Sequence, residues 1–365
     1  MTKTQSADRI LLATTIGLVL FGIVMVYSAS AIMAQQVYDN QYYFLIKQAV
    51  AAVVGIGLML ALMSFDYEHL KKPAVVYGLL GLSLVTLLAV LFLPATKGTH
   101  RFIRLPGFSF QPSEMAKLAV VLFLAYYLNK RADKIKSVKQ TFIPCVVVSG
   151  IVMALVLAGK DLGTTAVIAL VTALMLTISG VPIRYLAICA LPVLPLLYWQ
   201  LFHVSYRLER LKAFLDPWQY ARDEGFQVVQ SLIAIGSGGV NGAGLSQGKQ
   251  KMFYLPEAHT DFIYSVVGEE LGLVGASTVV MLFLVLLWRG FRVARRSEES
   301  FGTLLATGLT AMLVAQALFN VSVVLSLVPA KGIPLPFISY GGTSLVVSLI
   351  AAGALLNISH HVETE

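Results

Sequence analysis

The sequence has little charge and almost no cysteine. Charged residues make up 13% of its 365 residues, hydrophobic residues make up 57%, and the mean hydropathy is +0.79. The two cysteines, Cys145 and Cys189, fall in different apolar segments. We therefore expect them to pack in the protein interior rather than to form a disulfide or a metal site, and they indicate no redox function.

Apolar runs of about 18 to 25 residues recur along nearly the whole chain, which is the length that a helix needs to cross a bilayer. The sequence therefore predicts an all-α polytopic membrane protein, folded as a single transmembrane domain over residues 1–365. Ten transmembrane helices are expected at residues 10–33, 43–64, 74–95, 112–129, 141–159, 162–180, 183–203, 262–288, 302–328 and 335–357. The first run is too long for the apolar region of a signal peptide, so we expect it to remain uncleaved.

The basic residues are scattered over the short loops between these spans. They form no stripe interleaved with aromatic residues, so the net charge of +8 does not indicate nucleic-acid binding. Fourteen of them map to the side of the membrane that holds both termini, and the positive-inside rule makes this side cytoplasmic. Eleven others map to the outer side, where ordinary connecting loops would not need them.

The segment 204–260, between the seventh and eighth spans, is too long for a plain connection and is predicted to be an ordered extracytoplasmic loop. Residues 205–216 separate apolar from basic side chains, which is typical of an interfacial helix, and Pro217 ends it. Residues 225–236 are apolar but too short to span, so they should dip into the membrane or pack on other helices. Six glycines between Gly236 and Gly248 indicate either close backbone approach to a ligand or a flexible surface turn.

Asp261 stands where this loop meets the eighth span. Small residues recur on the same helix face from Ser265 to Gly275, which indicates close helix packing, so Asp261 should face the protein or a cavity rather than lipid. Its carboxylate either caps the helix N-terminus or serves as an ionised base beside the glycine-rich loop. Asp161, at the start of the sixth span, leaves the same two interpretations open.

Further charged residues lie inside the predicted spans. Lys47 and Lys117 are the basic ones, and Glu114, Glu269 and Glu270 are acidic. Glu114 and Lys117 are consistent with a helix start that carries an internal ion pair. Alternatively, Lys117 neutralises Glu269 or Glu270 on the eighth span, because ions inside the membrane rarely go unpaired. In either case we expect Glu114, Lys117, Glu269 and Glu270 to be structural.

Four long motifs follow one another along the chain: HRFIRLPGFSFQPSEMAKL, GFQVVQSLIAIGSGGVNGAGL, YLPEAHTDFIYSVVGEELGLVG and PAKGIPLPFISYGGTSL. Together they resemble the SEDS family of bacterial cell-wall proteins. The resemblance covers nearly the entire chain and implies ten transmembrane helices. It also implies a peptidoglycan glycosyltransferase that polymerises lipid II at the outer face of the cytoplasmic membrane. The EAHTDFI segment and the last span are more similar to the division members of the family than to its elongation members.

The resemblance assigns residue roles as well. The essential aspartate of the family matches Asp261, which we expect to be the general base for the acceptor sugar hydroxyl. Gly159-Lys160 stands before Asp161 where the family often has Gln-Pro. The residues expected to bind the pyrophosphates and sugars are Arg101, Arg104, Arg207, Arg210, Lys249, Lys251, Lys331 and Asp161. About half of these cations could instead pair with acidic residues of the same loop.

The expected partners are lipid II, lipid-linked glycan, a class B penicillin-binding protein transpeptidase and other divisome or elongasome membrane proteins. No metal site is predicted from the residues, although Mg²⁺ at the pyrophosphates stays open. One alternative function is a lipid II flippase, with charges along a path across the bilayer. Another is a non-catalytic scaffold for the transpeptidase. The located charges cluster toward the outer half of the membrane, which favours the enzyme.

Overall fold

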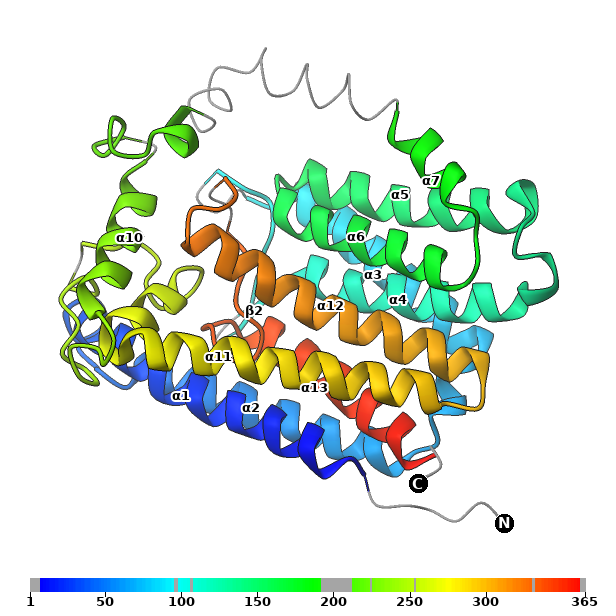
Figure 1. The fold of residues 1–365 in the computed structure, drawn as a ribbon, viewed down its shortest axis with the longest axis horizontal. Helices are drawn as coiled ribbons and strands as arrows, with labels where there is room; N and C mark the ends of the chain where they lie inside the picture. Colours follow the sequence, from blue (N-terminus) through cyan, green and yellow to red (C-terminus); the bar gives the residue numbers. More distant parts are fainter. Residues whose placement is uncertain are drawn as a thin grey trace.

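The computed structural model describes residues 7–94, 98–105, 108–191, 212–223, 225–252, 254–329 and 332–361. Most of this chain is helical, and the long helices lie side by side in one bundle (Figure 1). The helices are α1 (Arg9–Tyr38), α2 (Tyr43–Ser64), α3 (Pro73–Phe92), α4 (Pro112–Lys130), α5 (Ile143–Ala158), α6 (Leu162–Ile178), α7 (Ile183–Ala190), α10 (Phe226–Gly238), α11 (Ile263–Arg296), α12 (Ser300–Val324) and α13 (Gly342–His360). Shorter elements are η1 (Tyr67–Lys71), η2 (Ala132–Lys134), η3 (Val138–Phe142) and the antiparallel strands β1 (Ile103–Leu105) and β2 (Phe108–Phe110).

Seven helices in the described part of the chain are long and apolar enough to cross a membrane: α1, α2, α3, η3 continued by α5, α11, α12 and α13. The other three predicted spans correspond to α4, α6 and α7. α4 carries a carboxylate and a lysine near its start, and α6 is a shorter apolar helix of 17 residues. The predicted span 183–203 continues past α7 into residues outside the described part. The all-α, ten-span fold is thus confirmed.

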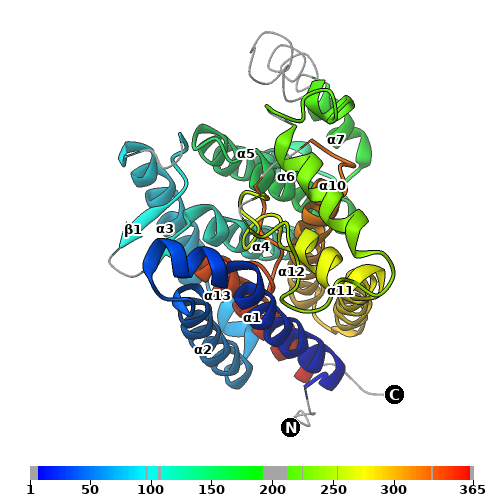
Figure 2. The same cartoon turned by 90° about the vertical axis from the view of Figure 1, so that its left-hand side faces the viewer.

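The centre of the bundle is formed by α4, α12 and α13 (Figure 2). The apolar windows of α12 and α13 are 78% and 83% buried, whereas those of the other candidate spans are between 22% and 44% buried. α12 packs on α4, α6 and α11, and α13 packs on α2. The outer helices therefore present broad apolar surfaces to lipid, and the polar groups on α4 and α12 lie inside protein.

The two ends of the bundle differ. α1 begins and α13 ends at the same end. There Asp8 forms an ion pair of 2.5 Å with Arg289 of α11 and donates its backbone N–H to the hydroxyl of Ser359. The opposite end carries the β1–β2 hairpin, α10 and the glycine-rich loop (Figure 1). Of the predicted interfacial helix, residues 212–215 form one helical turn, and the rest lies outside the described residues.

The connection from α12 to α13 runs as irregular chain into the bundle. Its residues Ile333, Leu335 and Phe337 are buried, and α1 lets it approach because Gly22 has no side chain where the carbonyl of Phe337 lies. Irregular backbone at membrane depth requires polar partners from the protein. Gln48 of α2 supplies one, since its amide donates to the carbonyl of Ser339 at 3.1 Å. This segment carries the chain back beside Asp261.

Helix α11 is broken at Gly272, whose φ of 64° and ψ of −162° leave the helical region. The glycine-rich loop fills the break, because Leu273 and Val274 donate their backbone N–H groups to the carbonyls of Gly239 and Val240 at 2.9 and 3.2 Å. α10 packs on α11, as one of the two interpretations of this apolar segment predicted, and Gly238 has no room for a side chain against the carbonyl of Gly268. Gly238 and Gly242 therefore serve close backbone contact with α11, since a side chain at either would meet the backbone of Gly268 or Glu270.

Candidate active site

Asp261 lies in the turn that leads into α11. The N-cap of α11 is Phe262, which makes no side-chain capping hydrogen bond, so Asp261 does not occupy the N-cap position that one interpretation gave it. The Asp261 carboxylate lies instead against Gly332 of the irregular segment: a methyl group placed on Gly332 would be 2.5 Å from Asp261 Oδ2. The carboxylate is thus held beside backbone that has no side chain to cover it.

Arg101 approaches the same glycine. That methyl group on Gly332 would also be 3.7 Å from Arg101 Nη1, so the guanidinium and the carboxylate flank one residue. Nη2 of Arg101 donates to the carbonyl of Lys160, and its buried Nε has no hydrogen-bond partner among the described residues. An arginine held in this way keeps donors available for an anion, which suits phosphate recognition.

Asn320 of α12 fixes the backbone of this site. Its side-chain amide donates to the carbonyl of Asp261 and to the carbonyl of Ile333, both at 2.7 Å. One buried amide therefore ties the start of α11 to the irregular segment. Each such bond contributes about 1 kcal/mol net, and loss of the donor would leave two buried carbonyls unsatisfied, which costs more.

Lys117 lies buried on α4, where it forms an ion pair of 2.9 Å with Glu114 and donates to Oε1 of Gln316 on α12. The amide of Gln316 in turn donates to the carbonyl of Pro334 at 2.9 Å. The internal ion pair at the start of α4 is therefore confirmed. The alternative, in which Lys117 neutralises Glu269 or Glu270, is wrong, because Lys117 is held by Glu114 and by Gln316 of α12, and the glycine-rich loop binds Glu269 and Glu270.

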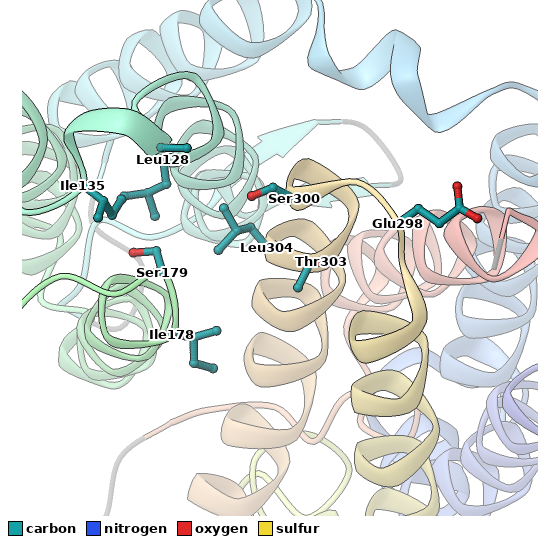
Figure 3. Close-up of a pocket in the computed structure, with 9 residues that line it drawn as sticks. Leu128, Ile135, Ile178, Ser179, Glu298, Ser300, Thr303 and Leu304 are labelled. Atoms are coloured by element: carbon teal, nitrogen blue, oxygen red, sulfur yellow. The ribbon is translucent and has the colours of Figure 1, made fainter. Parts of the chain in front are cut away.

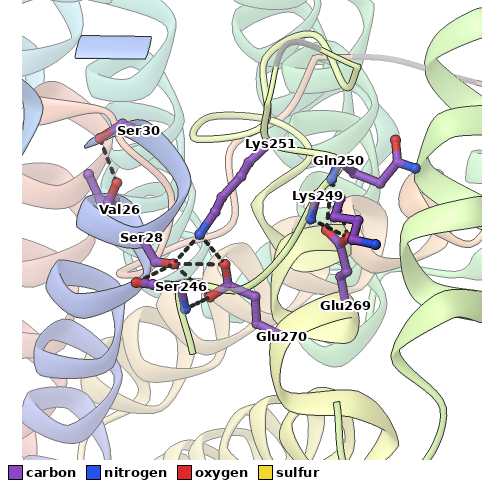
Figure 4. A network of polar contacts seen from close by, with 9 residues as sticks. All are labelled: Val26, Ser28, Ser30, Ser246, Lys249, Gln250, Lys251, Glu269 and Glu270. Carbon is purple, nitrogen blue, oxygen red and sulfur yellow. Dashed lines mark hydrogen bonds and ion pairs between the residues drawn. The ribbon is translucent and has the colours of Figure 1, made fainter. Parts of the chain in front are cut away.

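Glu269 and Glu270 hold the glycine-rich loop (Figure 4). Glu269 accepts hydrogen bonds from the backbone N–H groups of Lys249 and Gln250, at 2.7 Å and 3.2 Å. Glu270 forms an ion pair of 2.5 Å with Lys251 and accepts bonds from the hydroxyl of Ser28. Loop amides and a loop lysine thus neutralise both carboxylates.

Lys251 itself lies in this network with 5% of its surface exposed. We had expected it to bind substrate phosphate. Its ammonium donates to Glu270 and to the hydroxyl of Ser28 at 3.1 Å, so a buried ion pair rather than a ligand accounts for its position. Glu270 is buried on the adjacent helix and needs a counter-ion, and the loop cation Lys251 provides it.

Asp161 is the N-cap of α6, which confirms its capping interpretation. It is 2% exposed and accepts hydrogen bonds from Gln111, from Ser113 and from both the backbone N–H and the hydroxyl of Thr164. These partners saturate the carboxylate, so the expectation that Asp161 contacts substrate is not supported by its surroundings. It anchors instead the turn whose carbonyl, at Lys160, receives Arg101.

The remaining predicted cations divide into two groups. Arg104, on β1, and Lys249, in the glycine-rich loop, are exposed at the same end of the bundle as Asp261. Arg207, Arg210 and Lys331 lie outside the described residues. The geometry therefore brings Asp261 and Arg101 together, and it leaves Arg104 and Lys249 at the periphery.

Three residues at this site were missed from sequence: Gly332, Gln316 and Asn320. Gln316 and Asn320 are four residues apart on α12, so they lie on one face of a helix that is otherwise strongly apolar. Two side-chain amides on one face of a buried membrane helix are a signal that polar backbone packs against it. Gly332 had no comparable signal, since nothing in the sequence shows which backbone the chain brings beside Asp261.

A separate cavity of about 360 Å³ lies at the opposite end of the bundle (Figure 3). Leu128, Ile135, Ser179 and Leu304 are among the residues that line it, and none of the predicted site residues does. Among the described residues, no cluster of three or more histidine, cysteine, aspartate or glutamate side chains could hold a metal ion.

The fold and the site together define a polytopic membrane protein in which an aspartate and an arginine meet at one end of a helical bundle. Comparison with known proteins extends this description. The family model FTSW_RODA_SPOVE, described as "Cell cycle protein", matches residues 8–364. The chain belongs to this family.

Relatives of known name cover the chain almost completely. It is 47% identical over 361 residues to the "Probable peptidoglycan glycosyltransferase FtsW" of Geobacter sulfurreducens, covering 98% of this chain and 96% of that protein. A chain solved in work on "Structural coordination of polymerization and crosslinking by a peptidoglycan synthase complex" has a TM-score of 0.79 and 27% identity, covering 97% of each chain. The crystal structure of the rod shape determining protein RodA of Thermus thermophilus has a TM-score of 0.72 and 26% identity, covering 98% of each chain.

Proposed function

We propose that this chain is a peptidoglycan glycosyltransferase that polymerises lipid II into glycan strands, with Asp261 as general base. The names of its relatives support the enzyme class. The observation that carries the assignment of Asp261 is its position: the residue precedes the N-cap of α11, and its carboxylate lies beside Gly332, as the Arg101 guanidinium does. A base must be ionised and fixed in place, and the Asn320 amide fixes the backbone of this one.

The reaction follows from these two groups. The 4-hydroxyl of the acceptor sugar attacks the anomeric carbon of the donor, and a new C–O bond forms as the bond to the lipid pyrophosphate breaks. Asp261 accepts the hydroxyl proton, a contribution of about 10² to 10⁴-fold for one positioned base. The leaving pyrophosphate carries away the electron pair, and Arg101 stabilises its charge with guanidinium donors. Arg104 and Lys249 are the next cations that such an anion would meet.

The proposed orientation places Asp261 outside the cell. The bundle end that carries α1's start and α13's end also carries the basic loops after α2, α4 and α11, and the positive-inside rule makes this end cytoplasmic. Both termini are then cytoplasmic. The enzyme would act on a lipid-linked donor that brings its own leaving group, so it needs no nucleotide.

A division role and a class B penicillin-binding protein partner are part of the same proposal. Support for the first comes from the FtsW name of a relative that is 47% identical to this chain, and support for the second from the neighbour solved in a peptidoglycan synthase complex. Other divisome membrane proteins are expected partners by the same reasoning. A Mg²⁺ ion could join the site through the substrate phosphates, because Mg²⁺ commonly uses only one or two protein carboxylates.

The test is polymerisation of labelled lipid II in detergent by the purified protein, with and without a transpeptidase partner. We expect Asp261→Asn to lose at least about a hundredfold in glycan product. Detergent removes the two compartments, so polymer formed there is not the result of flipping. Equal product from the variant would remove Asp261 as base. No polymer under any condition would favour the flippase or the scaffold, and loss of product on chelation would reveal a metal.

A further inference from the structure

Lys47 lies one turn into α2, at the same end of the bundle as Asp261. Its Nζ donates to the hydroxyl of Tyr43 at 2.6 Å and lies 4.2 Å from the centre of that ring. Among the described residues it forms no ion pair. An ammonium has three donors, so two remain for another acceptor. An ionisable group in a membrane helix without a protein counter-ion points to a ligand.

The Tyr43 phenol that accepts from this ammonium lies near two other phenols. The ring of Tyr38 stacks on that of Tyr43, with centroids 3.9 Å apart and planes 8° from parallel. Tyr340, in the loop before α13, lies close to both. Burial raises the pKa of Tyr340 to about 12, and the adjacent Tyr43 and Tyr38 phenols add to this shift. The ammonium of Lys47 and the hydroxyl of Tyr43 therefore lie together at an aromatic cluster, and an ammonium beside a hydroxyl donor is suited to a carboxylate or phosphate oxygen.

Two exposed aromatic rings flank the short turn between α1 and α2. Tyr38 is 46% exposed and Tyr42 is 45% exposed, and Tyr42 stacks on Tyr27 at 5.7 Å. Stacking holds each ring in place and leaves its other face accessible. The apolar face of a pyranose ring packs well on such a surface, because its C–H groups meet the electron-rich face of the ring.

The cluster is continuous with the chain that carries Asp261. Phe44 lies between His259 and Tyr340, with ring centroids 4.6 Å and 4.9 Å away. Tyr340 donates its backbone N–H to the carbonyl of His259 at 2.9 Å, and Ser339 donates its hydroxyl to the carbonyl of Thr260 at 2.6 Å. The phenol cluster therefore lies directly beside the last residues before the proposed base.

A second lysine–tyrosine pair shows what an ordinary interface contact looks like in this protein. Lys130, in the last turn of α4 at the opposite end, lies over the ring of Tyr126 and donates to its hydroxyl at 3.4 Å. Tyr126 is buried, and its ring meets that of Tyr77 edge to face rather than in a stack. Anchoring at the interface accounts for Lys130, but it does not require the array around Lys47.

We propose that Lys47, with Tyr38 and Tyr42, forms a subsite for the saccharide strand next to the catalytic aspartate. The two exposed rings stack on sugars, and the ammonium of Lys47 binds a carboxylate carried by the strand. This inference rests on the proposed function, since it assumes that the saccharide is a peptidoglycan strand bearing acidic peptides.

The test uses a soluble disaccharide-peptide fragment of peptidoglycan, in its free acid form and as its methyl ester. Binding to the purified full-length protein in detergent is measured by ligand-observed NMR, without turnover. We expect esterification to weaken binding roughly tenfold, as loss of one charge-assisted hydrogen bond implies. Lys47→Met should weaken the acid by the same factor and leave the ester unchanged. Lys47→Arg should restore binding to within about threefold, and Lys130→Met is the matched control.

Equal affinity of the wild-type protein for acid and ester would overturn the subsite, as would the absence of detectable binding. This comparison needs no variant, so it stands even where Lys47→Met fails to fold. The polymerisation assay gives a separate result. A protein that makes no polymer but binds the acidic fragment through Lys47 would contradict the glycosyltransferase function and support the saccharide subsite. Normal polymerisation with equal affinity for acid and ester would support the glycosyltransferase function and contradict the subsite.

Discussion

Replacing Gly332 by alanine should inactivate the protein without unfolding it. The new methyl group would lie 2.5 Å from Oδ2 of Asp261, whereas an ordinary carbon–oxygen contact needs at least about 3.4 Å. Something must therefore shift by about 1 Å. The Asp261 side chain is the more mobile partner, because Asn320 ties the backbone on both sides. A displacement of about 1 Å at a reacting group can cost about 100-fold in rate, or roughly 2.7 kcal/mol in the barrier.

The measurement is the initial rate of glycan formation from labelled lipid II, together with thermal unfolding of the same preparation in detergent. Gly341→Ala is the matched control, since a methyl group there would meet only the Cβ of Ser344, at an ordinary 3.6 Å, on extended backbone. We expect the control to retain its rate. A fully active, stable Gly332→Ala protein would refute the placement of Asp261 as base, and equal losses of rate and stability would show a packing defect instead.

Two further predictions concern the buried ion pairs. Lys117→Met leaves Glu114 buried without its counter-ion, so it should lower the free energy of unfolding by about 3 to 5 kcal/mol. Adding Glu114→Gln should recover most of this loss. Thermal unfolding measures both effects, and a Lys117→Met protein as stable as the wild type would contradict the prediction. Glu270→Gln removes the counter-ion of Lys251 and weakens the acceptor of the Ser246 backbone N–H. Hydrogen exchange at the Ser246 amide should therefore accelerate. An unchanged exchange rate would contradict this account.

Hydropathy and helix signals predicted much of the fold. The run from 112 to 129 begins at Pro112 in the structure as the sequence indicated, because proline suits the first turn of a helix. Asp161 caps α6 for a similarly local reason, since a carboxylate accepts the free N–H groups of a helix start. Such features depend on a few neighbouring residues, which a sequence displays directly.

The parts that escaped prediction depend on which segments meet in space. Lys117 could pair with a carboxylate on its own helix or on α11, and only the packing of α4 on α12 decided it. Lys251 looked like a substrate ligand because the sequence does not show that the glycine-rich loop folds back onto Glu270. Asp261 was identified by motif, but its relation to Gly332 depends on how the irregular chain between α12 and α13 enters the bundle.

The break at Gly272 divides α11 into a short segment next to Asp261 and a long segment that ends at Arg296. The glycine-rich loop is bonded to both segments. Glu269 and Glu270 hold it from the short one, and Leu273 and Val274 donate their backbone N–H groups to it from the long one. A force applied to the loop would therefore reach the backbone on both sides of the break, and a partner bound on the loop would in this way shift the residues that follow the proposed base.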